Sequence, residues 1–357
     1  MALGSPLLLP GCAAHPSGQS YEDAVHSIWR PFDGSVMNER SALMLELVRH
    51  ATLAPSSHNT QCWKFAIREK EIAILPDMTR RCPVVDPDDH HLFVSLGCAA
   101  ENLVQAAQAC GYWAIPGFEP GPVESVRIDL RPSKAVATPL FKAIPQRQCT
   151  RNEYDGEQLD NEEMMLLERA GNGRGVRVLL FTESGIMEKL LEFIVQANLE
   201  QMSDRGFVDE LLKWVRFSER EALDAGDGLF AATSGNPSAP RWLGQVLFDL
   251  FATPKRENDK LVRQVRSSSG IAVFVSEADD KEHWIEAGRC YERFALQATA
   301  LGIRNAFMNQ PVEVPGFRSR LAAMLGLGSG RPDLVVRFGR GPEMPRSLRR
   351  PLPAVLT

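Results

Sequence analysis

Two stretches of the chain align with each other without a gap, and this internal similarity is the feature that most constrains the fold. Residues 97–111 can be laid over residues 288–302 so that both terminal glycines, one glutamate and two alanines agree. Each stretch predicts an alanine-rich helix ended by glycine. Upstream, residues 43–65 and 163–181 each predict a helix, a turn and a strand, in that order. Any two alanine-rich helices ending in glycine look alike, but the shared order of the flanking elements favours duplication.

The repeat divides the chain into a tail and two halves. We expect an N-terminal tail over residues 1–35, a first half over 36–138 and a second half over 139–357. The second half carries an insertion from about residue 199 to 259. Segments of that length are more often binding elements than unstructured loops. The insertion is therefore either a lid over a site or helical decoration whose aromatic residues pack on the core.

Composition excludes several classes of function. The 357 residues are 44% hydrophobic and 24% charged, as in ordinary globular proteins. A formal net charge of -5 argues against nucleic acid as a partner. No run of apolar residues is long enough for a bilayer. The seven cysteines have no metal-ligand spacing, so we expect no metal, and Cys98 and Cys110 are expected to be buried in helices.

The N-terminus leaves the compartment open. Residues 7–14 resemble the end of a bacterial lipoprotein signal, with Cys12 at the lipidation position. The first basic residue is Arg30, so the basic region that a signal peptide needs is missing. Two alternatives follow. Either this is the disordered tail of a cytoplasmic protein, or the true start lies upstream of Met1 and the protein is periplasmic or membrane-anchored.

A polar loop over residues 54–62 joins a predicted helix to a predicted strand. The sequence Ala-Pro-Ser-Ser-His-Asn-Thr-Gln-Cys places hydroxyls and amides between two apolar elements. Such a loop can present hydrogen-bonding groups to a ligand, or it can be an ordinary turn rich in turn formers. Ser267, Ser268, Ser269 and Gly270 form a similar polar group, which we interpret as the turn that enters a strand.

These segments resemble motifs of the flavin-dependent nitroreductase family, and the chain is similar to its fused, internally duplicated Acg-like branch. Residues 55–63 match P-S-x-x-N-x-Q-P-W, with Cys62 in place of the proline. Residues 147–151 resemble the R-R-S-x-R motif, with Cys149 in place of the serine. Residues 347–351 resemble the terminal basic pair, and 308–313 resemble the segment whose backbone N–H approaches flavin N5.

The resemblance implies an α+β fold: two nitroreductase-like halves with mixed, mainly antiparallel sheets flanked by helices. It also implies FMN between the halves. Residues of the first half would meet the ribityl chain and the pyrimidine edge, and arginines of the second half would hold the phosphate. The FMN-binding residues that it implies are Ser56, Ser57, Asn59, Gln61, Arg147, Cys149, Arg151, Met308, Asn309, Gln310, Arg349 and Arg350.

By the same resemblance, the expected activity passes electrons from NADPH or NADH through FMN to a nitroaromatic, a quinone or a similar acceptor. Two alternatives remain: an FMN-sequestering protein with a closed lid, and an enzyme of the same fold with one narrow task. No catalytic residue is predicted, because flavin chemistry does not require an acid or base from the protein. His58, His90 and His91 are expected to be solvated. The protein would be a monomer with pseudo-dimeric halves, or a homodimer.

Overall fold

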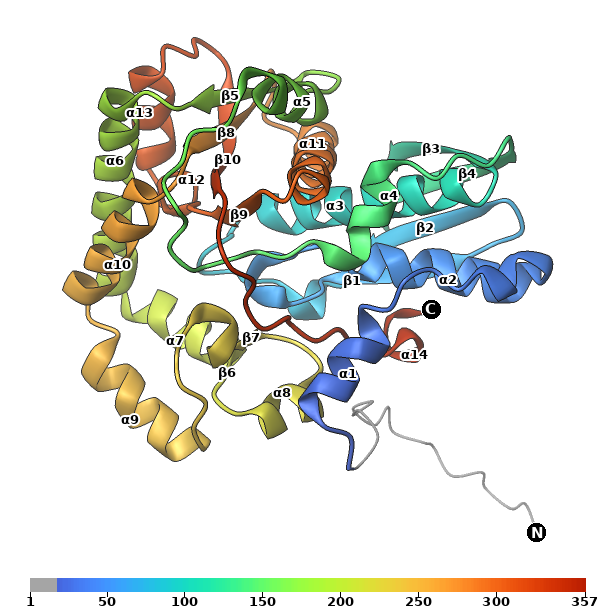
Figure 1. Cartoon of the computed structure of the whole chain (residues 1–357), viewed down its shortest axis with the longest axis horizontal. Helices are drawn as coiled ribbons and strands as arrows, with labels where there is room; N and C mark the ends of the chain where they lie inside the picture. Colours follow the sequence, from blue (N-terminus) through green and yellow to red (C-terminus); the bar gives the residue numbers. More distant parts are fainter. Residues whose placement is uncertain (1–17) are drawn as a thin grey trace.

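The computed structural model describes residues 18–357, which form helices around two four-stranded sheets (Figure 1). Cys12 and its apolar neighbours lie outside the described residues, so the alternative of an export signal stays a prediction. Among the residues that are described, no helix combines the length and the apolar character needed to span a membrane.

The first half is built on an antiparallel sheet with the strand order β1-β2-β4-β3. One face of β3 is largely exposed, whereas α3 is buried along most of its length because its alanines allow neighbours to approach closely. The elements are α2 (Arg40–Thr52), β1 (Trp63–Ile67), β2 (Glu71–Pro76), α3 (His90–Ala109), β3 (Tyr112–Glu119) and β4 (Ser125–Pro132).

The second half repeats this topology with the strand order β5-β8-β10-β9, again antiparallel throughout. The equivalent elements are α5 (Asn161–Gly171), β5 (Val176–Phe181), β8 (Gly270–Ser276), α11 (Lys281–Ala300), β9 (Arg304–Phe307) and β10 (Arg331–Gly339). Two sheets with one strand order are what a duplication requires. The antiparallel pairing that we expected is confirmed, and parallel pairing between strands is confined to β6 and β7 of the insertion.

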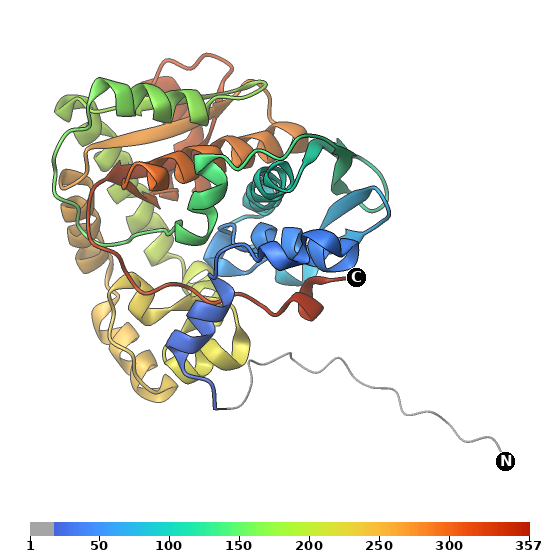
Figure 2. The ribbon, with the colours of Figure 1, turned by 45° about the vertical axis from the view of Figure 1, so that its right-hand side comes forward.

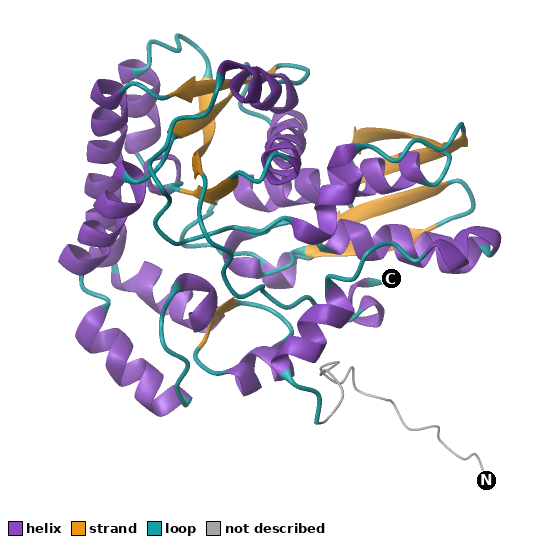
Figure 3. Ribbon diagram, in the orientation of Figure 1, coloured by secondary structure: helices purple, strands orange, loops and turns teal. Residues whose placement is uncertain are grey.

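The second sheet is buried on both faces, which explains why β8 reads as a continuous apolar run. Ala272 and Phe274 pack into the core that contains α11. Ile271 and Val273 face the other way, into a separate core with α6 (Ser184–Ser203) and α10 (Pro254–Arg266). The two layers of helices on either side of this sheet are visible in Figure 3.

The insertion occupies the place of the short turn between β1 and β2 in the first half. The predicted boundaries, 199 and 259, are wrong, because they fall inside α6 and α10, and these helices cover the sheet. Only the segment between them leaves the sheet. It contains α7 (Arg205–Trp214), β6 (Val215–Arg216), α8 (Glu219–Ala225), β7 (Leu229–Phe230) and α9 (Arg241–Phe251). We call residues 205–251 the lid segment.

Residues 18–35 are not a tail, which corrects that part of the prediction. Helix α1 (Tyr21–Ile28) packs on the lid segment, and the Tyr21 ring lies 4.8 Å from that of Phe230. The Trp29 Nε1–H donates to the carbonyl of Ser347 at 2.9 Å. Sequence analysis did not predict this short helix, because it lies before the first of the two repeated halves.

The C-terminal segment crosses from the second half back to the first (Figures 1 and 2). It leaves β10, passes α1, and ends in α14 (Leu352–Val355) beside β1. Leu356 forms a parallel bridge with Phe65 on β1, so the last residues extend the first sheet at its edge. The remaining helices are α4 (Pro139–Ala143), α12 (Gln310–Glu313) and α13 (Phe317–Met324).

The halves meet where α3 packs against α11, and this contact is part of the largest apolar core (Figure 2). Gly97 of α3 lies against Gly288 of α11, which allows the two backbones to touch. The aligned stretches of the sequence therefore face each other at the seam between the halves.

Candidate functional site

The loop after α2 has an unusual backbone. His58, Asn59 and Gln61 have φ angles of 47°, 54° and 52°, in the left-handed region that residues other than glycine rarely adopt. The Ser56 hydroxyl accepts a hydrogen bond from the Gln61 N–H at 2.9 Å, which fixes the turn. Backbone strain of this kind is held in place by its surroundings and clusters at binding sites.

Arg349 holds this loop from the C-terminal segment. Its guanidinium is buried and donates to the carbonyls of Thr52, Leu53 and Ala54 at 2.8–3.1 Å, and to the Asn59 Oδ1 at 3.1 Å. Burial lowers the pKa of Arg349 to about 9, and the charge of nearby Arg147 adds to this effect. An arginine so destabilised in its charged form favours an anion close by.

Arg147 is also buried and forms an ion pair in the seam. Its Nε lies 3.1 Å from Oε1 of Glu292 on α11, and its Nη2 donates to the carbonyl of Leu53 at 2.9 Å. Burial lowers the pKa of Arg147, but Glu292 more than offsets this, so the pKa is raised overall. Much of this guanidinium is therefore engaged within the protein.

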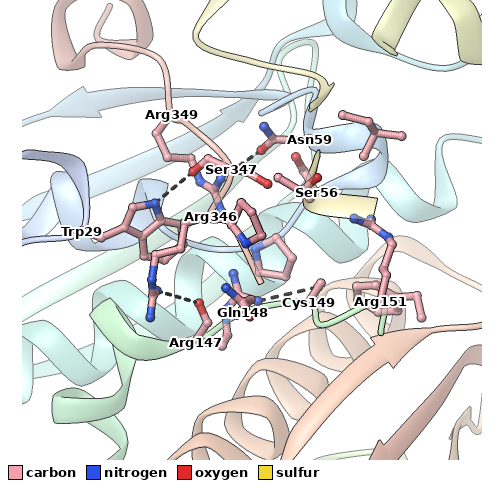
Figure 4. A pocket seen from close by; sticks show the side chains of 15 residues that line it. Trp29, Ser56, Asn59, Arg147, Gln148, Cys149, Arg151, Arg346, Ser347 and Arg349 are labelled. Carbon is pink, nitrogen blue, oxygen red and sulfur yellow. Dashed lines mark hydrogen bonds between the residues drawn. The ribbon is translucent and has the colours of Figure 1, made fainter. Parts of the chain in front are cut away.

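A small cavity of about 60 Å³ lies between these arginines, and we call it the cationic cavity (Figure 4). Four arginines line it, and none of its described lining residues is an Asp or a Glu. Arg151 is the least engaged of the four, because within residues 18–357 its side chain has neither an ion-pair nor a hydrogen-bond partner. The polar lining consists of Ser56, Asn59, Arg147, Gln148, Cys149, Arg151, Thr233, Arg346, Ser347 and Arg349.

A second cavity, of about 160 Å³, opens at the seam and draws on both halves. The first half contributes Pro55–His58 and part of α3, and the second contributes the end of β9 and α12. We call it the seam cavity. Its lining is Pro55, Ser56, Ser57, His58, His91, Val94, Ser95, Cys98, Arg151, Phe307, Asn309, Gln310, Glu313 and Leu334.

The third cavity is the largest, about 580 Å³, and lies under the lid segment. Apolar side chains of α7, α9 and the segments between them cover it, among them Phe207, Leu211, Leu247 and Phe248. We call it the lid cavity. Arg151 and Phe307 line all three cavities, so the three spaces are neighbours along one path. The volume of the lid cavity is in the range typical of small-molecule binding sites.

Ten of the twelve residues that the resemblance implied line at least one of these cavities. The exceptions are Gln61 and Arg350, whose contacts lie elsewhere. The Gln61 Oε1 accepts from the Arg350 N–H at 2.7 Å, and its Nε2 donates to the carbonyl of Gly226. These two residues tie the loop to the C-terminal and lid segments, and a role at the cofactor stays a prediction.

The segment after β9 is only partly available for a ligand. The Met308 N–H donates to the carbonyl of Val335 at 2.7 Å, so it belongs to the sheet. The Asn309 Oδ1 accepts from the Val335 N–H at 3.0 Å. Any backbone donor to a ligand would therefore come from residues after Met308, where α12 begins.

The expectation of solvated histidines is wrong for His90 and His91, which begin α3 and are 0% and 4% exposed. His58 is half-buried in the strained loop, and burial lowers its pKa to about 4. Ligand atoms of Asp86, His90 and His91 lie close enough to hold a metal. The carboxylate of Asp86, however, already accepts the N–H groups of His91 and Leu92, where it caps α3.

Sequence reasoning missed part of the site. Phe307 ends β9 and reads as an ordinary strand residue, although it lines all three cavities. Trp29, Gln148 and Arg346 also line the cationic cavity. Gln148 stands inside the motif at 147–151 and Arg346 precedes the motif at 347–351, whereas no motif pointed to Trp29. Ser267, Ser268 and Ser269 line none of the three, as expected of the turn before β8.

Known proteins are similar to this chain over most of its length. A Mycobacterium tuberculosis protein named "Putative NAD(P)H nitroreductase Rv3131" is 26% identical over 318 residues, which cover 86% of this chain and 88% of the relative. "Putative NAD(P)H nitroreductase acg" of the same organism is 22% identical and covers 86% and 93%. Over most of its length the chain is similar to proteins named as NAD(P)H nitroreductases.

Other comparisons are weaker. No family model matches the chain. The solved FMN-dependent nitroreductase NfnB of Mycobacterium smegmatis, in complex with NADPH, shares 13% identity over 57% of this chain and 87% of its own, with a TM-score of 0.37. A nitroreductase structure from Anabaena variabilis gives 11% identity, 76% and 69% coverage, and a TM-score of 0.41. In this protein both halves belong to one chain, and both contribute to the candidate site.

Proposed function

We propose that this nitroreductase-like protein is an FMN-dependent oxidoreductase that takes electrons from NADPH or NADH and passes them to a nitroaromatic, a quinone or a similar acceptor. The observation that carries the proposal is the cationic cavity. Four guanidiniums around a space without a lining carboxylate are costly unless an anion neutralises them. FMN carries such an anion, a phosphate on a flexible chain.

The other cavities fit the rest of that cofactor. The seam cavity adjoins the cationic cavity through Ser56, Arg151 and Phe307, and it offers hydroxyls and amides beside an apolar wall. Such a lining suits an amphipathic ring with polar edges. In bound form FMN would supply the hydride and electron chemistry, and the protein would supply binding and orientation.

Within this site, the chain's own residues have distinct tasks. Arg151 is the guanidinium best placed to meet the phosphate, because it lines the cationic, seam and lid cavities and its donors are not engaged by described residues. Arg147 and Arg349 donate hydrogen bonds to the loop 53–59 and add positive charge to the wall of the cationic cavity. Ser56, Ser57 and Asn309 present polar groups along the seam cavity. The lid cavity is left for the nicotinamide donor and the acceptor in turn.

The proposal is tested by spectroscopy of the purified protein. Added FMN should bind and give the visible spectrum of a flavoprotein, and NADPH or NADH should bleach that spectrum under anaerobic conditions. A quinone added afterwards should restore it. A protein that stays colourless after FMN is added and the excess removed would overturn the proposal.

A second function, FMN sequestration, is favoured by the extent of the lid segment. The lid cavity is covered by α7 and α9, and the Asn59 side chain donates to the carbonyl of Gly228, which ties the lid segment to the first half. If dithionite reduces the bound flavin but neither nicotinamide does, storage replaces turnover as the function. Rapid bleaching by NADPH or NADH would exclude storage.

A further inference from the structure

A buried carboxyl group stands on the boundary between the seam cavity and the lid cavity. Glu313 is the last residue of α12 and lines both spaces. Its Oε2 accepts a hydrogen bond from Gln201 Nε2 of α6 at 2.8 Å, and its Oε1 lies 3.8 Å from His91 Nε2 of α3. The carboxyl group is thus positioned by one residue from the helix that leads into the lid segment and one from the first half.

Nothing among the described residues pairs Glu313 with a lysine or an arginine. Arg318, whose charge acts on Glu313, instead donates from Nε to the carbonyl of Val312 at 2.9 Å. Burial raises the pKa of Glu313 to about 7, although the Gln201 hydrogen bond and the Arg318 charge oppose this shift. Other titratable groups near it are His91, which burial keeps neutral, and the Cys82 thiol. The seam and lid cavities that Glu313 lines also contain His58, Cys98, Arg151, Arg256, Glu257 and Lys260. At neutral pH a large fraction of Glu313 therefore carries a proton.

We propose that Glu313 is the acid that protonates the acceptor in the lid cavity during its reduction. The inference rests on the proposed function and specifies its substrate class: acceptors that take up a hydride together with a proton, such as quinones. FMN, if bound and reduced, would supply the hydride, with its electron pair, that one end of the acceptor takes up. The Glu313 O–H bond breaks, its proton forms an O–H bond on the acceptor, and the carboxylate remains until solvent reprotonates it.

The geometry makes an internal donor useful. Apolar side chains of the lid segment line much of the lid cavity, so a quinone reduced against them would become an anion on a poorly solvating wall. A positioned acid removes that charge as it forms, and such general acids contribute roughly 10²–10⁴-fold to a rate. Glu313 reaches the boundary where the ring and the acceptor would meet.

The alternative role is structural: Glu313 would only anchor Gln201 and thereby α6. Glu313→Gln separates the two roles, because glutamine keeps the shape and the hydrogen-bonding ability but has no acidic proton. The matched control is Glu200→Gln, an exposed carboxyl group on α6 next to Gln201. In Glu200→Gln, FMN affinity, anaerobic bleaching by NADPH and reoxidation should all equal those of the wild-type protein.

The deciding measurement is reoxidation of the reduced protein by two oxidants. Benzoquinone needs a proton with the hydride, and its reduction should slow at least 10-fold in Glu313→Gln. Ferricyanide takes single electrons without a proton, and its rate should not change. Infrared spectra of the cofactor-free protein provide an independent readout. The protonated-carboxyl band that fades between pH 6 and 8 should lose one component in Glu313→Gln, whereas the components of Asp86 and Glu292, whose pKa burial also raises to about 7, should remain.

Each outcome decides a separate question. If wild-type protein is not bleached by either nicotinamide, the proposed function fails. If bleaching is normal and benzoquinone oxidises Glu313→Gln as fast as wild type, this inference alone is overturned. Equal slowing with both oxidants would assign Glu313 a structural role and would also overturn it.

Discussion

Gly97 of α3 and Gly288 of α11 meet at the crossing of the two helices, and each makes the same contact with the other half. A Cβ on Gly97 would lie 2.0 Å from the carbonyl oxygen of Ile285, and a Cβ on Gly288 would lie 2.0 Å from that of Val94. These partners are themselves equivalent in the aligned repeats. The seam is therefore a pseudo-twofold contact within one chain, like the isologous contact of a homodimer.

This relationship predicts that Gly97→Ala and Gly288→Ala both destabilise the protein. A methyl group at either site forces the backbones apart, and overpacking of this kind costs about 1–3 kcal/mol or more. Urea unfolding should show the loss. Gly185→Ala is the control, because the nearest atom to a Cβ there is a flexible Glu183 oxygen at 3.6 Å. Wild-type stability in both seam variants would contradict a close helix crossing.

The ion pair between Arg147 and Glu292 gives a second prediction. Arg147→Met leaves Glu292 buried without a partner, which typically costs about 3–5 kcal/mol of unfolding free energy. The double variant Arg147→Met/Glu292→Leu removes both charges and should be markedly more stable than the single variant. Urea titrations of the two proteins make the comparison. A double variant no more stable than Arg147→Met would show that the pair is not coupled.

Arg151 should behave differently from Arg147. Its side chain has no partner among the described residues, so Arg151→Ala should change the unfolding free energy by less than about 0.5 kcal/mol. If it meets the FMN phosphate, the same variant should lose about 1.5–3 kcal/mol of FMN affinity. Quenching of FMN fluorescence measures the binding. The exposed Arg174→Ala serves as control, and unchanged affinity in Arg151→Ala would place the phosphate elsewhere.

The repeat and most residues of the candidate site could be recognised in the sequence because both depend on local patterns. Glycine spacing marked the helices at the seam, and the motifs at residues 55–63 and 147–151 contributed seven of the 15 residues that line the cationic cavity and five of the 14 that line the seam cavity. What it did not reveal was the partner of each arginine. Arg147 and Arg349 look equivalent to Arg151 in sequence, and only packing at the seam turns them inward toward Glu292 and the carbonyls of residues 52–54.

Two other misses have the same physical origin. The predicted boundaries of the insertion were wrong because the lid segment separates α6 from α10 in the sequence. In the structure these two helices pack side by side on one face of the sheet. His90 and His91 look like polar loop residues after a run of aspartates, but α3 begins at His90 and carries both into the core. Oδ1 of Asp333, in the second half, lies 3.0 Å from His90 Nε2, and no local sequence pattern predicts this contact between the halves.

A pH dependence of stability follows from His50. This side chain is fully buried, and burial, together with the adjacent Arg49 charge, lowers its pKa to about 4. Because the pKa is near 6.5 in the unfolded chain, the unfolded state binds more protons between those values. The contribution of His50 is therefore present above pH 6.5 and is lost as the pH falls toward 4, by about 3 kcal/mol in total.

The test compares urea midpoints at several pH values for wild type and His50→Gln. The variant should have a smaller loss of stability between pH 6.5 and 4. His26→Gln changes an exposed histidine of α1 and should keep the wild-type dependence. Parallel curves for wild type and His50→Gln would mean that His50 is protonated in the folded protein.

The lid cavity offers a test of what controls acceptor size. Leu247 and Val246 are neighbours on α9, but Leu247 lines the cavity whereas Val246 points outward and is 49% exposed. Leu247→Trp should fill part of the space and raise the KM of bulky quinones several-fold more than that of small ones. Its FMN affinity should not change, because the cationic and seam cavities are untouched. Val246→Trp adds a large aromatic side chain one residue away and should leave every KM as in wild type. The added indole enters existing space, so Leu247→Trp should unfold at the wild-type urea concentration. Identical acceptor profiles for the two variants would show that acceptors do not bind beneath α9.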